Sequence, residues 1–144
     1  MRLKEFFVTA AGIVGAFIST ALGGWDMGLQ TLVVFMLLDY VTGLIVAGVF
    51  KKSGKSENGA LDSKAGWKGL FKKGMTLLVV LIGHRLDLVM GISVIREAVI
   101  IAYIVNETLS IIENAGLMGL PIPKMLRDAI DILKTRADGD DEKL

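Results

Sequence analysis

Long apolar runs dominate the first third of the chain. Between residues 6 and 50 only two side chains are charged, Asp26 and Asp39. An amphipathic helix of a soluble protein carries polar residues along one face, which these runs lack. A bilayer-spanning helix needs about 20 apolar residues. The pattern therefore predicts two membrane spans, at 6–22 and 29–50.

Only the short segment 23–28 separates these two spans, so we expect a tight helical hairpin. Trp25 would lie at the level of the lipid headgroups, where indole rings are favoured. Because Arg2 and Lys4 precede it, the first span also has the pattern of a secretory signal peptide. The further apolar segments downstream favour a resident membrane protein over an exported one.

A strongly basic block follows at 51–73, with seven lysines and two acidic residues. Within it Trp67, Leu70 and Phe71 are spaced i, i+3, i+4, a pattern typical of a helix lying in the membrane interface. Next to a membrane span, such lysines favour anionic lipid headgroups as partners over nucleic acid. The residues predicted at the membrane surface are Lys64, Trp67, Lys68, Lys72 and Lys73.

The second half of the chain predicts two further spans, each interrupted by polar residues. The third begins at Gly74, and a turn near 90–91 separates it from a fourth that starts at Ile92 or Ala98 and ends at Ile112. The third is expected to be tilted or partly immersed; alternatively, one helix is short and the polar cluster lies at the outer surface. The interrupting residues are His84, Arg85, Asp87, Arg96, Glu97, Asn106 and Glu107.

Basic residues mark the orientation, because they concentrate on the cytoplasmic side of membrane proteins. They precede the first span, fill the block 51–73 and follow the fourth span, whereas the loop 23–28 has none. This distribution favours four crossings with both termini inside. A three-crossing layout would leave the basic carboxyl-terminal segment outside.

The carboxyl-terminal segment is predicted to be cytoplasmic. After Pro121 and Pro123, residues 124–134 form an amphipathic helix, and the charged residues 135–144 are expected to be unstructured. The apolar stripe of that helix is Met125, Leu126, Ala129, Ile130 and Leu133. The predicted fold is thus an all-α integral membrane protein, with a transmembrane domain at 1–113 and a cytoplasmic segment at 114–144.

Composition narrows the possible chemistry. Apolar residues make up 53% of the 144 residues, and the mean hydropathy is +0.60. The absence of cysteine excludes disulfides and thiol catalysis, and a single histidine excludes a multi-histidine metal site. No phosphate-binding loop or Ser-His-Asp set is present, so we expect neither an enzyme nor a cofactor.

Asp39 lies near the centre of the second span, where a charge costs about 2.5–3.5 kcal/mol. Protonation, a partner charge or a wet interface would relieve that cost. Its role is either helix packing within one bundle or contact with an oligomer interface or aqueous lumen. In the fourth span Arg96, Tyr103 and Glu107 share one flank. This flank either lines an aqueous lumen or forms ion pairs within one bundle, with His84, Arg85 and Asp87.

Small residues recur at four-residue spacing in the first span, a pattern that lets membrane helices approach closely. Gly43 and Ala47 repeat it in the second span. These rows indicate lateral association of helices, including between copies of the chain. The predicted helix-packing residues are Gly12, Gly15, Ala16 and Ser19.

Three short blocks resemble the bacteriophage holin family, which also includes toxin-secretion holins. The segment Asp39-Tyr40-Val41-Thr42-Gly43 resembles its Asp-Tyr-x-Thr-Gly element, and blocks at 61–73 and 106–123 match in order and spacing. The resemblance marks a set of positions as oligomer-interface or lumen candidates. They are Asp39, Tyr40, Thr42, Gly43, Asn106, Glu107, Glu113 and Asn114.

The resemblance implies a non-enzymatic protein of the bacterial cytoplasmic membrane. Holins oligomerise there and open lesions. An endolysin, or at toxin loci a toxin, leaves the cell through them. Direct contact between the holin and the released protein is not required. Two other functions stay open on the residues alone. A small four-helix ion or multidrug transporter also uses a buried carboxylate, and a membrane adaptor would recruit a partner through the lysine block.

Overall fold

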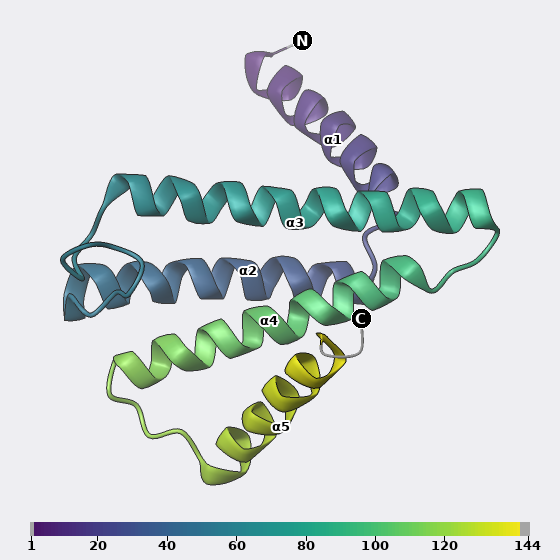
Figure 1. The fold of residues 1–144 in the computed structure, drawn as a ribbon. Coiled ribbons are helices and arrows are strands. Elements are labelled where there is room, and N and C mark those ends of the chain that lie inside the picture. The colour runs from purple at the N-terminus through teal and green to yellow at the C-terminus, as the bar shows by residue number, and fades with distance from the viewer. Residues whose placement is uncertain (1, 142–144) are drawn as a thin grey trace.

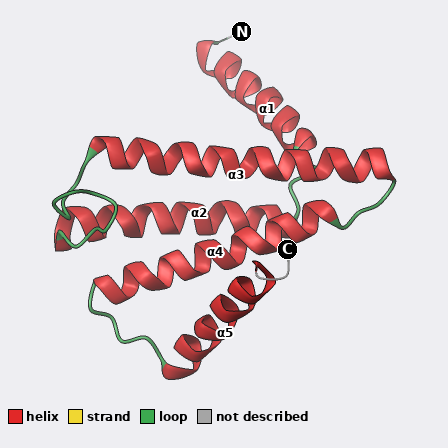
Figure 2. Ribbon diagram, viewed as in Figure 1, coloured by secondary structure: helices red, strands yellow, loops and turns green. Residues whose placement is uncertain are grey.

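A computed structural model describes residues 2–141, and their side chains except at 130, 133–134 and 136–141. Within these residues the chain consists of helices and loops, without strands (Figures 1 and 2). The elements are α1 (Leu3–Ala21), α2 (Met27–Ile45), the π-helix η1 (Val46–Phe50), α3 (Ser63–Met90), α4 (Ile95–Leu117) and α5 (Lys124–Asp141).

Helices α2, α3 and α4 form the body of the molecule, and each runs antiparallel to the next along the chain (Figure 1). Helix α4 packs against both of the others and closes the bundle. Its core is aliphatic, as the apolar stripes of three facing helices require. The buried core residues are Leu22, Leu29, Leu32, Met36, Val80 and Ile100.

Helix α1 projects away from this bundle (Figure 1). All of its residues are described, and none is buried. At the two glycines of its small-residue rows, Gly12 and Gly15, an added Cβ would meet nothing within 4 Å. The rows are therefore unoccupied within one chain, and the packing role predicted for them stays a prediction.

Local polar groups define where the helices begin and end. Asp26 Oδ1 accepts a hydrogen bond from Leu29 N (3.0 Å) and caps α2, and Asp62 Oδ1 accepts one from Lys64 N (3.1 Å) at the start of α3. Helix α3 ends at Gly91, whose φ of 67° is left-handed. Glycine adopts this conformation without the steric penalty of a side chain.

The predicted interfacial helix and third span are one continuous helix, so the predicted division at Gly74 is wrong. Helix α3 has 28 residues, about 42 Å at 1.5 Å per residue. A single glycine does not end a helix whose flanking residues pack, and Thr76 and Val80 are buried just beyond it. The predicted turn at 90–91 is confirmed.

The carboxyl-terminal segment also differs from expectation. The amphipathic helix predicted to begin at Lys124 does so, but α5 continues to Asp141. Residues 135–141 are therefore helical rather than unstructured. The remaining predicted tail, 142–144, lies outside the described residues.

Two helical segments in the described chain are long and apolar enough to cross a bilayer, Leu3–Ala21 and Met27–Phe50. They correspond to the first two predicted spans. The second segment includes η1, which extends α2 before Lys51 turns the chain with a left-handed φ of 52°. Helices α3 and α4 carry more charged residues, several of which pair inside the bundle.

Candidate functional site: a buried ionic cluster

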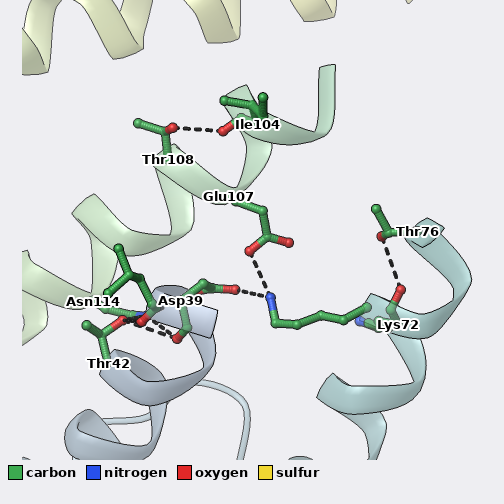
Figure 3. A network of polar contacts seen from close by, with 10 residues as sticks. Asp39, Thr42, Lys72, Thr76, Ile104, Glu107, Thr108 and Asn114 are labelled. Atoms are coloured by element: carbon green, nitrogen blue, oxygen red, sulfur yellow. Dashed lines mark hydrogen bonds and ion pairs between the residues drawn. The ribbon is translucent and has the colours of Figure 1, made fainter. Parts of the chain in front are cut away.

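One lysine joins the three helices of the bundle. Lys73 Nζ on α3 lies 2.7 Å from Asp39 Oδ2 on α2 and 2.8 Å from Glu107 Oε2 on α4. Figure 3 shows both carboxylates directed toward this one nitrogen. Asp39 and Glu107 are buried, so a single charged group holds two carboxylates that are shielded from solvent. We call these three residues the ionic cluster.

Helix geometry explains why the cluster forms at this point. On α3 the residues at 73, 76, 80, 83 and 87 are spaced by three or four, so they follow one face of the helix. From Thr76 to Asp87 that face is buried against the bundle. Lys73 continues the stripe, and its long side chain spans the distance to the other two helices.

A second set of hydrogen bonds holds Asp39 from the other side. Asn114 Nδ2 on α4 donates to Asp39 Oδ1 (3.2 Å), to the backbone oxygen of Asp39 (3.2 Å) and to Thr42 Oγ1 (2.9 Å). Thr42 in turn donates to the backbone oxygen of Leu38 at 2.7 Å. Figure 3 shows Asn114 and Thr42 together beside Asp39. Gly43 lies beside this set, and an added Cβ there would make an ordinary contact with Asn114 Nδ2 at 3.8 Å.

Tyr40 of α2 contacts the first turns of α3. Its hydroxyl donates to the backbone oxygen of Gly66 at 3.4 Å. A Cβ at Gly66 would lie 3.4 Å from the Tyr40 hydroxyl, and one at Gly69 would lie 3.6 Å from its ring. Both are ordinary van der Waals distances, so the tyrosine packs directly on the surface of α3 at these two glycines.

An open cleft of about 1420 Å³ lies beside the ionic cluster. Its walls are the second half of α2, the loop 51–62 and the first half of α3, and residues of α4 close its inner end. Asn106, predicted as a lumen candidate, lines that end beside Glu107. The ionic cluster therefore faces a space that is large enough to admit water and solutes.

A separate polar site joins α4 to the loop between α1 and α2. Arg96 Nε donates to the backbone oxygen of Leu22 (2.6 Å), and Nη2 donates to that of Gly24 (3.0 Å). Arg96 Nη1 pairs with Asp26 Oδ2 at 2.6 Å. The hydrogen bond from the guanidinium holds the pKa of the Asp26 carboxyl below its ordinary value.

The same site requires glycine at position 23. Its φ is +90°, and an added Cβ would lie 2.5 Å from Arg96 Nε and 2.8 Å from His84 Nδ1. Asp87 completes the site, since its two carboxylate oxygens accept hydrogen bonds from Ile95 N (2.9 Å) and Arg96 N (3.0 Å). We call Gly23, Asp26, Asp87 and Arg96 the hairpin clamp.

The structure thus divides the predicted site residues into two groups. Asp39, Thr42, Asn114 and Glu107 meet at the ionic cluster, whereas Asp87 and Arg96 meet at the hairpin clamp. Arg96 forms an ion pair within the chain, which was the alternative to a residue lining an aqueous lumen. Its partner, however, is Asp26, which was not a candidate. The candidates on exposed surface are Arg85, Asn106 and Glu113.

Lys73 was predicted at the membrane surface, but the structure directs it inward. Its side chain is 15% exposed, whereas Lys64, Trp67, Lys68 and Lys72 are exposed. The four-and-three spacing places Lys73 on the same helix face as Thr76 and Val80, but its two partners lie 34 positions away in the sequence. Among the described residues no group of three histidines or carboxylates is arranged to hold a metal ion.

Comparison with known proteins identifies the family. Residues 16–135 match the bacteriophage holin family. The chain belongs to this family. The match covers both the ionic cluster and the hairpin clamp, and it confirms the resemblance inferred from the three sequence blocks. Family membership, together with the two long apolar helices, indicates a membrane protein.

Several relatives align over most of the chain. An uncharacterized protein of Halalkalibacterium halodurans is 39% identical over 93% of this chain and 95% of its own. An uncharacterized protein of Listeria monocytogenes is 37% identical over 90% of this chain and 87% of its own. A probable holin of Bacillus phage phi105 is 32% identical, over 80% of each chain. No solved structure matches the chain.

Proposed function

We propose that this protein is a holin that oligomerises in the bacterial cytoplasmic membrane and permeabilises it, so that an endolysin or a toxin leaves the cell. The observation that carries the proposal is membership of the bacteriophage holin family. The similarity to the probable holin of phage phi105 over four fifths of both chains supports it. No chemical step is required of the protein.

The proposed arrangement has four crossings, by α1, α2 with η1, α3 and α4, with both termini in the cytoplasm. The seven lysines of 51–73 favour that side for the loop between α2 and α3. Helix α3, at about 42 Å, is longer than the bilayer core of about 30 Å. Its first turns, with Trp67 exposed, would then lie among the headgroups.

The ionic cluster gives this holin a closed state that is stable in lipid. With Asp39 and Glu107 ionised and Lys73 protonated, each carboxylate contacts the ammonium group inside the bundle. Separation of the helices in lipid would leave those charges unpaired, which is unfavourable. Separation around water would not, so oligomers that enclose water would favour the open arrangement.

The cluster also provides a means of sensing membrane potential. Its formal charge is negative, with two carboxylates and one ammonium group. Moving one charge across the membrane is worth about 2.3 kcal/mol per 100 mV. Loss of the potential would therefore shift the balance between closed and open arrangements.

Expression in a host that carries a cytosolic endolysin tests the proposal. We expect lysis at a reproducible time after induction, and prompt lysis when an energy poison is added earlier. A signal-less endolysin alone, without the holin gene, is the control. Membrane integrity that survives both prolonged expression and poisoning would contradict the proposal.

A small ion or multidrug transporter is the alternative function, and the open cleft beside two buried carboxylates favours it. A transporter would give saturable flux of a defined solute in proteoliposomes without release of larger molecules. A holin would release an encapsulated protein-sized dye conjugate. The size of the released solute therefore separates the two functions.

A further inference from the structure

The cleft beside the ionic cluster is basic at the end next to the loop 51–62, and its α3 wall becomes apolar toward the middle of the bundle. One stripe of α3 faces it, formed in order by Lys64, Lys68, Lys72, Met75 and Val79, at spacings of three or four residues. The charged positions lie next to the loop 51–62, and the apolar ones lie toward the middle of the bundle. A phospholipid has the same order of groups, with an anionic headgroup followed by an acyl chain.

The facing wall adds apolar surface near this basic end. Leu44 of α2 and Ala47 of η1 line the cleft, and both follow Tyr40 toward the loop. Lys55 of the loop adds a further positive charge at the rim. Two of the acidic residues in the lining, Asp39 and Glu107, already contact Lys73. The rim therefore carries an excess of positive charge beside apolar wall residues, and the ionic cluster lies at the inner end.

The size and position of the cleft also fit a lipid. Pockets for small molecules occupy about 300–1,000 Å³, and this cleft has about 1420 Å³. The α3 stripe from Lys64 to Val79 covers 15 helical steps, about 22 Å along the helix. That length exceeds a headgroup and accommodates part of an acyl chain.

We propose that this cleft binds one anionic phospholipid from the leaflet on the side of the lysine loop. The headgroup phosphate lies among Lys55, Lys64 and Lys68, and an acyl chain runs from Leu44 on α2 toward Met75 and Val79 on α3. The bound lipid fills the space between α2 and α3 and shields the ionic cluster from water. The proposal rests on the membrane location given above, but it does not depend on lysis.

A pair of charge variants separates this site from general attraction to the membrane surface. Lys64→Gln/Lys68→Gln removes two charges from the cleft, whereas Lys51→Gln/Lys52→Gln removes two from the same basic block outside the cleft lining. Diffuse attraction depends on the number of charges near the surface and would weaken equally in both. A site in the cleft would be lost only in the first.

The full chain, purified in a neutral detergent and mixed with phosphatidylglycerol or phosphatidylcholine, is examined by native mass spectrometry. We expect one phosphatidylglycerol retained per chain by the wild type and by the 51/52 variant. Retention should fall at least tenfold in the 64/68 variant, and phosphatidylcholine should be retained weakly by all three. Equal loss in both charge variants, or no preference for phosphatidylglycerol, would overturn the site.

A second pair of variants keeps the charge constant. Leu44→Trp fills the cleft, whereas Leu37→Trp adds the same bulk on an exposed part of α2 outside the cleft lining. Only the first should reduce phosphatidylglycerol retention. Soluble glycerol phosphate is added as a competitor: displacement at equal concentration would assign the site to the headgroup chemistry alone and contradict the acyl-chain contact. Normal lipid binding by a chain that fails to lyse cells would refute the proposed function while leaving this site intact.

Discussion

Lys73 is the residue on which the packing of three helices depends. Its ammonium group contacts carboxylates from α2 and α4, both buried. Removing one partner of a buried ionic network leaves the others as uncompensated charges, which costs about 3–5 kcal/mol. Lys73 therefore contributes to stability chiefly because, without it, two buried carboxylates would have no positive charge beside them.

Lys73→Met tests this dependence, because methionine preserves most of the side-chain volume without the charge. We expect a lower free energy of unfolding, by about 3–5 kcal/mol, in detergent-solubilised protein titrated with denaturant. Lys72→Met is the matched control, since Lys72 is the exposed neighbour on the same helix. Equal stability of the two variants would show that the ion pairs do not hold the bundle.

Asp39→Ala addresses the timing of lysis. The substitution removes one carboxylate from Lys73 and one acceptor from Asn114, so the closed arrangement loses contacts on both sides. We expect the onset of lysis to change more than the amount of protein in the membrane, as measured by culture turbidity and by immunoblots of membrane fractions. Unchanged onset at unchanged accumulation would remove Asp39 from the proposed mechanism.

At the scale of elements, the hairpin clamp fixes how α1 leaves the bundle. Gly23→Ala places a methyl group 2.5 Å from Arg96 Nε at a φ of +90°. Gly24→Ala is a close control, because its φ of +104° imposes similar backbone strain but a Cβ there meets nothing within 4 Å. Both should destabilise by more than about 1 kcal/mol, and the first by more. Equal thermal stability of the two variants would exclude a steric role for the clamp.

The clamp should also weaken in acid. The pKa of Asp26 is lowered in the folded protein by its hydrogen bond from Arg96. Its contribution is therefore complete above the ordinary value of 3.8 and is lost as the pH falls through the lower folded value. Stability measured between about pH 6 and pH 3 should fall more for the wild type than for Asp26→Asn. Parallel curves would show that this pair is not linked to folding.

Some elements were predictable from sequence and others were not, for identifiable reasons. The first two spans follow from long runs with two charges, and the turn at 90–91 follows from Gly91. The continuity of α3 was missed because lysines at 72–73 have the pattern of an interface, although Lys73 is neutralised by residues 34 positions away in either direction. Contacts of that separation are not encoded in local spacing.

The sites show the same difference. The family-marked residues Asp39, Thr42 and Asn114 do meet, as shared motifs favour. Asp26 could not be recognised as the partner of Arg96, because its position at the start of a helix is explained by capping alone. Pairing between residues 70 positions apart requires the folded bundle.

At the scale of the whole molecule, α1 stands out because none of its residues is buried within one chain. Its apolar side chains are exposed along the helix, and its small-residue rows are open at Gly12 and Gly15. In the proposed membrane arrangement lipid or a second chain covers this helix. Close packing of small residues favours a second chain over flexible lipid tails, which agrees with the proposed oligomerisation.

The four-crossing arrangement can be tested directly, because the chain has no cysteine and single-cysteine variants are free of background. Ser93→Cys probes the α3–α4 connection, and Asn58→Cys probes the lysine loop; both positions are exposed. In intact spheroplasts a membrane-impermeant maleimide should label position 93 but label position 58 only after permeabilisation. Met125→Cys, on α5, should behave like position 58, because an even number of crossings returns the chain to the cytoplasm. Labelling of position 125 from outside would instead require three crossings, and the basic carboxyl-terminal helix would then oppose the charge rule that orients the rest of the molecule.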